Sequence, residues 1–178
     1  MNLIKSFAIL IALSGVFCSA QTSPAAANSK PTPMPQGPGY TLTVDQPLSS
    51  ISLKAPISVT MTVKNISGEE ILWRAYRGKD SEYKGFRFLL KKNGQEVETT
   101  FLHRKLTGRQ RQDDPSDVMS GSSIVFPWEA EKKFLMTIDL KRLYEITEPG
   151  QYTLDISRPE EDNKTVVRAN TVTLDIVP

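Results

Sequence analysis

Apolar and polar residues alternate along short runs of this chain, and this period of two constrains the fold more than any other feature of the sequence. In the first run, Tyr40, Leu42 and Val44 alternate with threonines. The same alternation recurs in the runs 57–63, 134–140, 152–156 and 172–176. Because successive side chains of a strand point to opposite faces, each run predicts a strand with one buried and one solvated face.

Residues with turn chemistry separate these runs. Asn93-Gly94 lies between the runs 86–90 and 96–98, and it predicts a tight hairpin because both of its positions accept positive φ. Pro149-Gly150 predicts a type II turn, in which proline fixes φ at the second position and glycine accepts the positive φ of the third.

Short strands joined by such turns are typical of an all-β fold. We expect an antiparallel two-sheet immunoglobulin-like β-sandwich of about seven to nine strands. The alternative is an up-and-down barrel, but the long irregular stretch 99–122 breaks the regular strand spacing of that fold. No segment sustains the 3.6-residue period of an amphipathic helix, and only 112–119 and 140–145 have room for a helical turn.

The first twenty residues resemble a secretory signal peptide in composition. Lys5 precedes an apolar stretch too short to span a bilayer, and Cys18-Ser19-Ala20 forms a small-residue cleavage site. We therefore expect cleavage before Gln21 and a secreted or periplasmic protein. The alternative is a lipoprotein attached through Cys18, although bulky Phe17 stands where lipoprotein signals carry a small residue.

Three segments follow from this interpretation. Residues 1–20 are the signal peptide, and 21–38 are a disordered linker rich in proline, alanine and serine. Residues 39–178 are one immunoglobulin-like β-sandwich domain, long enough to bury a core of its own. Cleavage removes the only cysteine of the chain, so the domain has no disulfide to rely on.

The charged and reactive residues exclude several functions. The 22 basic and 20 acidic side chains give a net charge of only +2. Domains that bind nucleic acid usually have a strong basic excess, so no nucleic-acid partner is expected. A single histidine and a single cysteine rule out the common zinc sites and, after cleavage, a cysteine nucleophile. Asp113, Asp114 and Asp117 lack the spacing of a calcium loop. We expect no cofactor, no metal, no transmembrane segment and no enzymatic activity.

His103 is the only histidine, and its neighbours Arg104 and Lys105 are cations that lower its affinity for a proton. A Ser-His-Asp triad is assembled in space, so composition alone leaves it open. No G-x-S-x-G elbow occurs, however, and we interpret His103 as a surface or packing residue.

Two stretches, 73–87 and 103–111, interleave aromatic residues, histidine and basic residues. Such residues stack on sugars or bases and hold anionic groups, but they also pack along a sheet edge and protect it with charge. If a recognition surface exists, we expect it here, with a protein or carbohydrate partner. The candidate residues are Trp73, Arg74, Tyr76, Arg77, Tyr83, His103, Arg104, Arg109 and Arg111.

The sequence Gly150-Gln151-Tyr152-Thr153-Leu154, which follows a turn and enters a strand, resembles the tyrosine corner of immunoglobulin-like sandwiches. That resemblance implies a hydrogen bond from the Tyr152 hydroxyl back to the preceding connection.

The chain is also similar to the bacterial intracellular proteinase inhibitor family and to the β-sandwich pro-domains of deuterolysin-type metallopeptidases. The similarity rests on Val63-Lys64-Asn65-Ile66-Ser67, Ile138-Asp139-Leu140 and Pro149-Gly150-Gln151-Tyr152. It implies the sandwich fold and, as an activity, inhibition or binding. Protease inhibition is therefore the alternative function, with the exposed segment 99–122 entering a protease cleft as an extended strand.

Asn65 and Asn163 each begin a formal glycosylation sequon, Asn65-Ile66-Ser67 and Asn163-Lys164-Thr165.

Overall fold

The structure is a computed structural model that describes residues 39–178 except 79, 116–121 and 161–164. The predicted signal peptide and linker, Asn163 and the second half of the predicted helical turn at 112–119 lie outside the described residues. The elements in chain order are β1 (Tyr40–Val44), β2 (Ile51–Ser52), β3 (Ser58–Asn65), β4 (Ile71–Arg77), the 3-10 helix η1 (Ser81–Tyr83), β5 (Arg87–Lys92), β6 (Gln95–Glu96), α1 (Phe101–Thr107), β7 (Ser122–Trp128), β8 (Lys133–Asp139), α2 (Leu140–Leu143), β9 (Gly150–Pro159), β10 (Val166–Arg168) and β11 (Val172–Val177).

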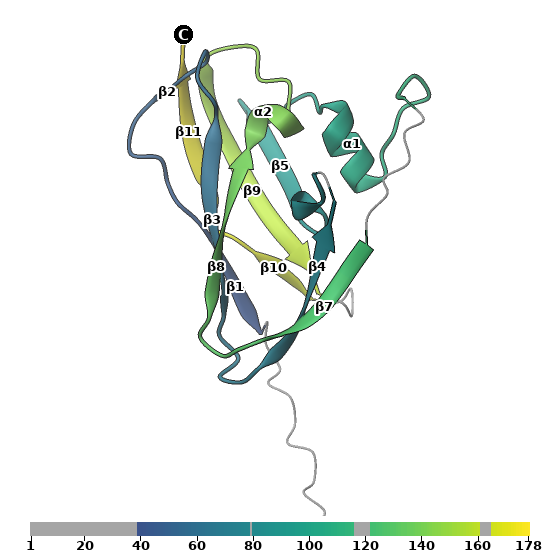
Figure 1. The fold of residues 1–178 in the computed structure, drawn as a ribbon. Helices are drawn as coiled ribbons and strands as arrows, with labels where there is room; N and C mark the ends of the chain where they lie inside the picture. The colour runs from purple at the N-terminus through teal and green to yellow at the C-terminus, as the bar shows by residue number, and fades with distance from the viewer. Residues whose placement is uncertain (1–38, 79, 116–121, 161–164) are drawn as a thin grey trace, which may run out of the picture. The chain divides into compact units, whose positions relative to one another are not determined.

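Two stacked sheets form the body of the domain (Figure 1). One has the order β1-β3-β8, and the other has the order β2-β11-β9-β5-β6, with β10 also paired to β9. Strand β2 runs parallel to β11, while the other strand pairs are antiparallel. The described residues thus form an all-β immunoglobulin-like sandwich rather than a closed barrel.

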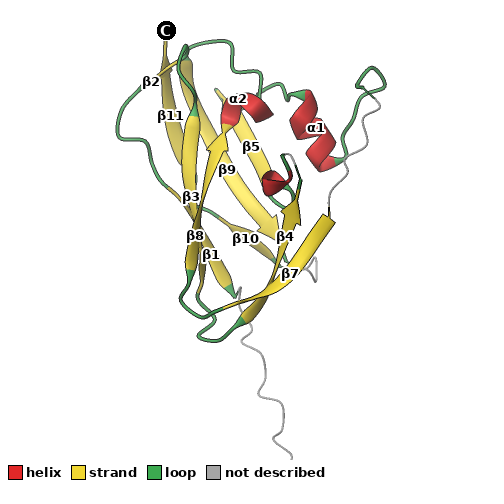
Figure 2. Cartoon of the chain, in the orientation of Figure 1, coloured by secondary structure: helices red, strands yellow, loops and turns green. Residues whose placement is uncertain are grey.

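A two-stranded ribbon, β4–β7, extends from the first sheet (Figure 2). The β3–β8 ladder ends at the pair Lys64–Lys133, and pairing resumes at Ile71–Trp128. Asn65 fills the corner between these ladders and is fully buried. Its Nδ2 donates to the carbonyls of Glu69, Trp128 and Glu129 at 2.9, 2.8 and 3.1 Å, and its Oδ1 accepts two bonds from Ser67.

The core lies between the stacked sheets and contains the residues that the period of two placed on inner faces. Val59, Met61 and Val63 of β3 face inward, as do Tyr152, Leu154 and Ile156 of β9. Because this alternation follows the sequence in β1, β3, β8, β9 and β11, the strand predictions for these runs are confirmed.

The predicted hairpin is also confirmed. Strands β5 and β6 pair antiparallel, and the residues between them, Asn93 and Gly94, adopt φ of 52° and 79°. Two positive φ values in succession are the signature of the tight turn that Asn-Gly favours. The strand count is higher than predicted, with eleven strands in the described residues, because β2, β6 and β10 contain only two or three residues each.

The predicted type II turn at Pro149-Gly150 is wrong. Gly150 has the positive φ that was expected, but at 144° it is the first residue of β9, paired with Ile176. This positive φ favours glycine, and a Cβ here would also lie 2.9 Å from Cε of Lys92, a contact that the flexible lysine side chain can relieve.

The prediction of an irregular stretch over 99–122 is wrong as well, because Phe101–Thr107 is helical. Thr100 caps this helix by accepting from the His103 N–H, and Gly108 ends it with φ of 69°. Seven residues are too few for a helical period to show, but both caps are visible in the sequence. The predicted helical turn near 140–145 is confirmed as α2.

Candidate functional site

The predicted recognition residues do not form one surface. Trp73, Tyr83 and His103 are all buried, so the prediction that places them on a surface is wrong. The rest divide between β4, which carries Arg74, Tyr76 and Arg77, and the helix α1 with the segment that follows it. The two groups have different neighbours.

Trp73 belongs to an aromatic cluster at the inner face of the ribbon. Its ring meets those of Tyr40, Trp128 and Phe134 edge-on, with centroids 5.2, 5.0 and 5.4 Å away. The Arg158 guanidinium stacks on Trp73, with Cζ 3.8 Å from the ring centroid. The cluster therefore contains its own cation, supplied by β9, and it stabilises the fold instead of facing a ligand.

Arg158 was not singled out from the sequence, although it is the cation closest to the predicted aromatic residues. One of its Nη atoms donates to the Arg74 carbonyl at 2.9 Å, which ties β9 to β4. Burial raises the pKa of the nearby Tyr40 hydroxyl to about 12, against the opposing charge of Arg158. Arg158 lies between Ser157 and Pro159 on β9 with no aromatic residue nearby in the sequence, and only the fold brings it to Trp73.

Tyr83, in η1, is also part of the interior. Its ring meets Phe88 edge-on at 6.0 Å, and the Arg142 guanidinium lies 5.8 Å from its centroid. Arg142 in turn forms ion pairs with Asp80 and Glu82. The aromatic ring and its cation are thus engaged within the domain.

His103 points from α1 toward α2 and is 6% exposed. Its Nε2 lies 3.4 Å from the Tyr144 hydroxyl. Its Nδ1 is buried without a hydrogen bond of normal geometry to the described residues. Burial lowers the pKa of His103, the Phe88 backbone opposes that shift, and the charges of Arg109 and Arg104 add to it. The packing interpretation of His103 agrees with this placement.

Arg104 and Arg111 hold the segment after α1 against the domain. Arg104 makes a two-point contact with Asp114, with Nε 2.9 Å from Oδ2, and also donates to the Thr99 carbonyl. The Asp114 side chain is only 6% exposed, and the bonds from Arg104 lower its pKa to about 2. Arg111 pairs with Glu98, which leaves exposed Arg109 as the arginine of this segment without a side-chain ion pair in the described residues.

The outer face of the ribbon, unlike the groups above, exposes large apolar side chains. Leu72 is 75% exposed and is paired directly with Pro127, while Val125 is 46% exposed and is paired with Arg74. Tyr76 lies on the same face, whereas Arg77, at the end of β4, has the parity of buried Trp73. We call the outer-face residues Leu72, Arg74, Tyr76, Val125 and Pro127 the ribbon surface.

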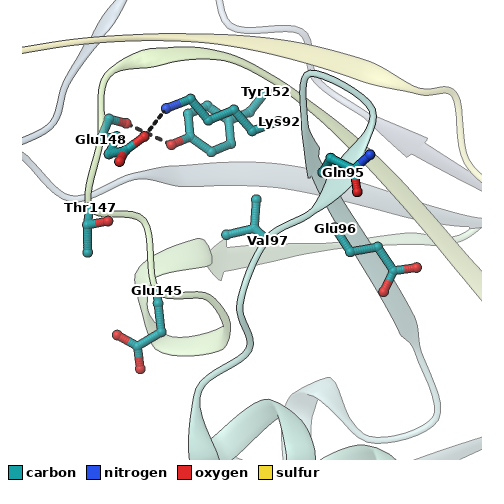
Figure 3. A pocket seen from close by; sticks show the side chains of 8 residues that line it. All are labelled: Lys92, Gln95, Glu96, Val97, Glu145, Thr147, Glu148 and Tyr152. Carbon is teal, nitrogen blue, oxygen red and sulfur yellow. Dashed lines mark hydrogen bonds and ion pairs between the residues drawn. The ribbon is translucent and has the colours of Figure 1, made fainter.

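A shallow pocket of about 230 Å³ lies at the tyrosine corner (Figure 3). It is lined by Lys92, Gln95, Glu96, Val97, Glu145, Thr147, Glu148 and Tyr152. The Tyr152 hydroxyl donates to the Glu148 carbonyl at 2.7 Å, which is the bond that the tyrosine-corner resemblance implied. Lys92 Nζ lies 2.6 Å from the Glu148 carboxylate, and this contact raises the pKa of Lys92 and lowers that of Glu148.

The pocket therefore brings together an ion pair and a structural hydrogen bond. Glu96 and Glu145 add negative charge at its rim, but no group of three or more histidine, cysteine or acidic residues in the described part of the chain is arranged to hold a metal ion. Its contacts fix the connection before β9, and we assign it a structural role.

Fold and geometry together define a two-layer β-sandwich domain with a tyrosine corner and an appended ribbon. No family model matches the chain, and no curated protein matches it. It is similar to the solved structure of the CARDB domain of a Pyrococcus furiosus protein, with 14% identity, a TM-score of 0.37, and coverage of 78% of this chain and 94% of that one. None of the helices in the described residues is both long and apolar enough to cross a membrane.

Proposed function

We propose that this protein is a non-catalytic binding module that docks a protein partner on the ribbon surface. The observation that carries the proposal is the exposure of Leu72 and Val125 on neighbouring strands, next to arginine side chains. Large apolar side chains grouped on a surface and bordered by polar residues are typical of protein contact sites.

The charge of the ribbon indicates which kind of partner fits. Strands β4 and β7 contain Arg74 and Arg77 and not one acidic residue. A complementary partner would present apolar side chains to Leu72 and Val125 and a carboxylate near Arg74, which lies on the same face. A glycan fits less well, because sugars stack on exposed aromatic faces and Trp73 is buried in the core.

Binding rather than catalysis is supported by the state of the most reactive side chain. His103 is buried, and the contact found for its ring nitrogens is with a tyrosine hydroxyl. A general base must reach the proton that it removes, and a buried imidazole among packed residues does not. Export, predicted from residues 1–20, would place the partner outside the cytoplasm.

The test is a capture experiment with matched variants. The wild-type chain and the variants Leu72→Ser and Val125→Ser are used as bait in the secreted fraction of the source cell. Leu135→Ser is the control, because Leu135 is 66% exposed on β8, away from the ribbon. We expect a protein that binds the wild type and the control, binds either ribbon variant about tenfold more weakly, and dissociates as salt rises. Equal capture by all four chains, or capture by none, contradicts the proposal.

A further inference from the structure

Two arginines flank a serine on three neighbouring strands of the larger sheet. Arg87 of β5 is directly opposite Ser157 of β9, and Arg168 of β10 is opposite the same Ser157. Directly opposite residues of antiparallel strands carry their side chains on the same face of the sheet. The three side chains therefore form one row across the sheet.

This row lies on the outer face of the sandwich. The residue next to each member of the row along its own strand, Phe88, Ile156 or Val167, is buried in the core, so the side chains of the row point the other way. Arg87 and Arg168 are exposed and Ser157 is half-buried. Arg158, one position along β9, confirms the alternation because its guanidinium stacks inward on Trp73.

The side chains of the row are not engaged with the rest of the domain. Neither arginine forms an ion pair with the described residues, and the Ser157 hydroxyl makes no hydrogen bond there. This contrasts with Arg104, Arg111 and Arg142, each of which has a carboxylate partner. Two unpaired guanidinium groups on one sheet face repel each other, and an anion between them would remove that repulsion.

We propose that Arg87, Ser157 and Arg168 bind a tetrahedral oxyanion, the sulfate or phosphate group of a ligand. Neighbouring strands are about 4.8 Å apart, so the arginines start about 10 Å apart and their long side chains meet over Ser157. Arginine forks bind oxyanions through paired N–H donors. A tetrahedral group offers oxygens to both forks and to the hydroxyl beneath, whereas a planar carboxylate has only two oxygens in one plane.

One carboxylate on the same face limits the affinity. Asp155 precedes Ser157 by two residues on β9, so it lies one row away on the outer face, where it accepts a hydrogen bond from Thr171. Its charge repels an anion held over Ser157. Lys91 lies further along the same face, opposite Thr153, and attracts one. The site is therefore open to water and weak for a single ion, and replacing Asp155 should strengthen it.

The test is an NMR titration of the ¹⁵N-labelled protein with sodium sulfate and, in a separate arm, sodium phosphate. Sodium malonate at the same ionic strength is the control, a dianion whose charge is on two planar carboxylates and not on a tetrahedral group. We expect saturable shifts of the Ser157 amide with sulfate and phosphate, and only a small unsaturated drift with malonate. The two positive arms show which tetrahedral ion binds more tightly.

Variants assign the effect to the row. Arg87→Gln and Arg168→Gln should each weaken sulfate binding by about two- to fivefold, and the double variant should abolish it. Asp155→Asn should tighten it, while Arg109→Gln, an exposed arginine beside α1, should change nothing. Equal responses to sulfate and malonate, or full binding by the double variant, would overturn the proposal. Thermal unfolding of each variant checks that the fold is intact.

Discussion

Asn65 shows how much of this fold depends on one side chain. It fills the corner between β3–β8 and β4–β7, and its amide donates to the carbonyls of three residues where the two ladders meet. The same Nδ2 is the atom that a glycan would modify in the Asn65 sequon. In the folded protein that atom is buried and donates its hydrogen bonds to backbone carbonyls of the domain.

Replacing Asn65 with alanine should therefore destabilise the protein by about 3 kcal/mol, because the buried Trp128 carbonyl loses its donor and the bonds to Glu69, Glu129 and Ser67 are lost with it. Urea unfolding measures the change in the free energy of unfolding. Asn170→Ala is the matched control, since exposed Asn170 bonds only to the backbone of Val44 and should lose about 1 kcal/mol or less. Equal losses in the two variants would show that the corner is not what Asn65 stabilises.

His103 should make the stability depend on pH in a narrow window. Burial holds its folded pKa below the ordinary value of 6.5, so below that pH the unfolded chain binds more protons than the folded one. Stability is fully present above about pH 6.5 and falls as the pH drops toward the lowered pKa, by at most about 1.4 kcal/mol per pH unit.

Urea midpoints measured between about pH 5 and 7 test this expectation. In His103→Gln the slope in this window should disappear. The loss that comes with protonation of Asp114, whose pKa is about 2, should remain at much lower pH. An unchanged slope in the variant would assign the dependence to another group.

The residue types of the candidate site were visible in the sequence, but their placement was not. Trp73 and Arg77 are four residues apart on β4, so their side chains start on the same side of the strand. Trp73 is nevertheless buried, whereas Arg77 is exposed at the strand end. What decides between them is the aromatic cluster contributed by β1, β7 and β8, together with Arg158 of β9. Contacts between strands so distant in sequence leave no local pattern.

At the scale of elements, long alternating strands could be predicted and short or capped elements could not. Buried and less buried residues alternate along most of β3 and β9, which have 8 and 10 residues, whereas β2 and β6 have two residues each. Helix α1 is also short, and its N-cap Thr100 does more than begin a helix. The Thr100 hydroxyl donates to the Arg142 carbonyl at 2.6 Å, so the cap joins α1 to α2.

The segment after α1 bears on the alternative function of protease inhibition. An inhibitory strand must be extended and accessible, but residues 101–107 are helical and Asp114 ties the following turn to Arg104. The extended conformation predicted for this segment is thus wrong in its first part. Inhibition itself stays a prediction, to be tested by titrating trypsin-like and subtilisin-like proteases with the protein.

Asp114→Asn should expose this segment to cleavage. Losing the carboxylate removes the two-point contact with Arg104, and trypsin needs a stretch of released backbone to cut at Arg109 or Arg111. We expect cleavage there to become at least about fivefold faster, as measured by mass spectrometry of timed digests. Asp113→Asn, at the exposed neighbouring position, serves as control and should leave the rate unchanged. Equal rates in the two variants would mean that the contact does not restrain the segment.

At the scale of the whole molecule, the described residues from 39 onward contain a core between two sheets. Every strand described there pairs with another strand of the same segment. The division into signal peptide, linker and domain remains a prediction.

A chain of residues 39–178 should therefore unfold with the same thermal midpoint as the chain beginning at Gln21, within about 2 °C, because the same surface is buried in both. Differential scanning calorimetry provides the comparison, and Val59→Ala in the shorter chain is a positive control for a lowered midpoint. A large drop on removing residues 21–38 would show that the linker packs on the domain.

The chain has two tryptophans, and both lie in the aromatic cluster beneath the ribbon surface. Their ultraviolet emission therefore comes from one corner of the molecule, shielded from water and beside a stacked guanidinium. An unlabelled fluorescence spectrum reports on that corner alone. Separation of the parallel β2–β11 pair would leave the spectrum unchanged until the ribbon opened, so fluorescence and circular dichroism recorded together distinguish local fraying of that pair from opening of the ribbon.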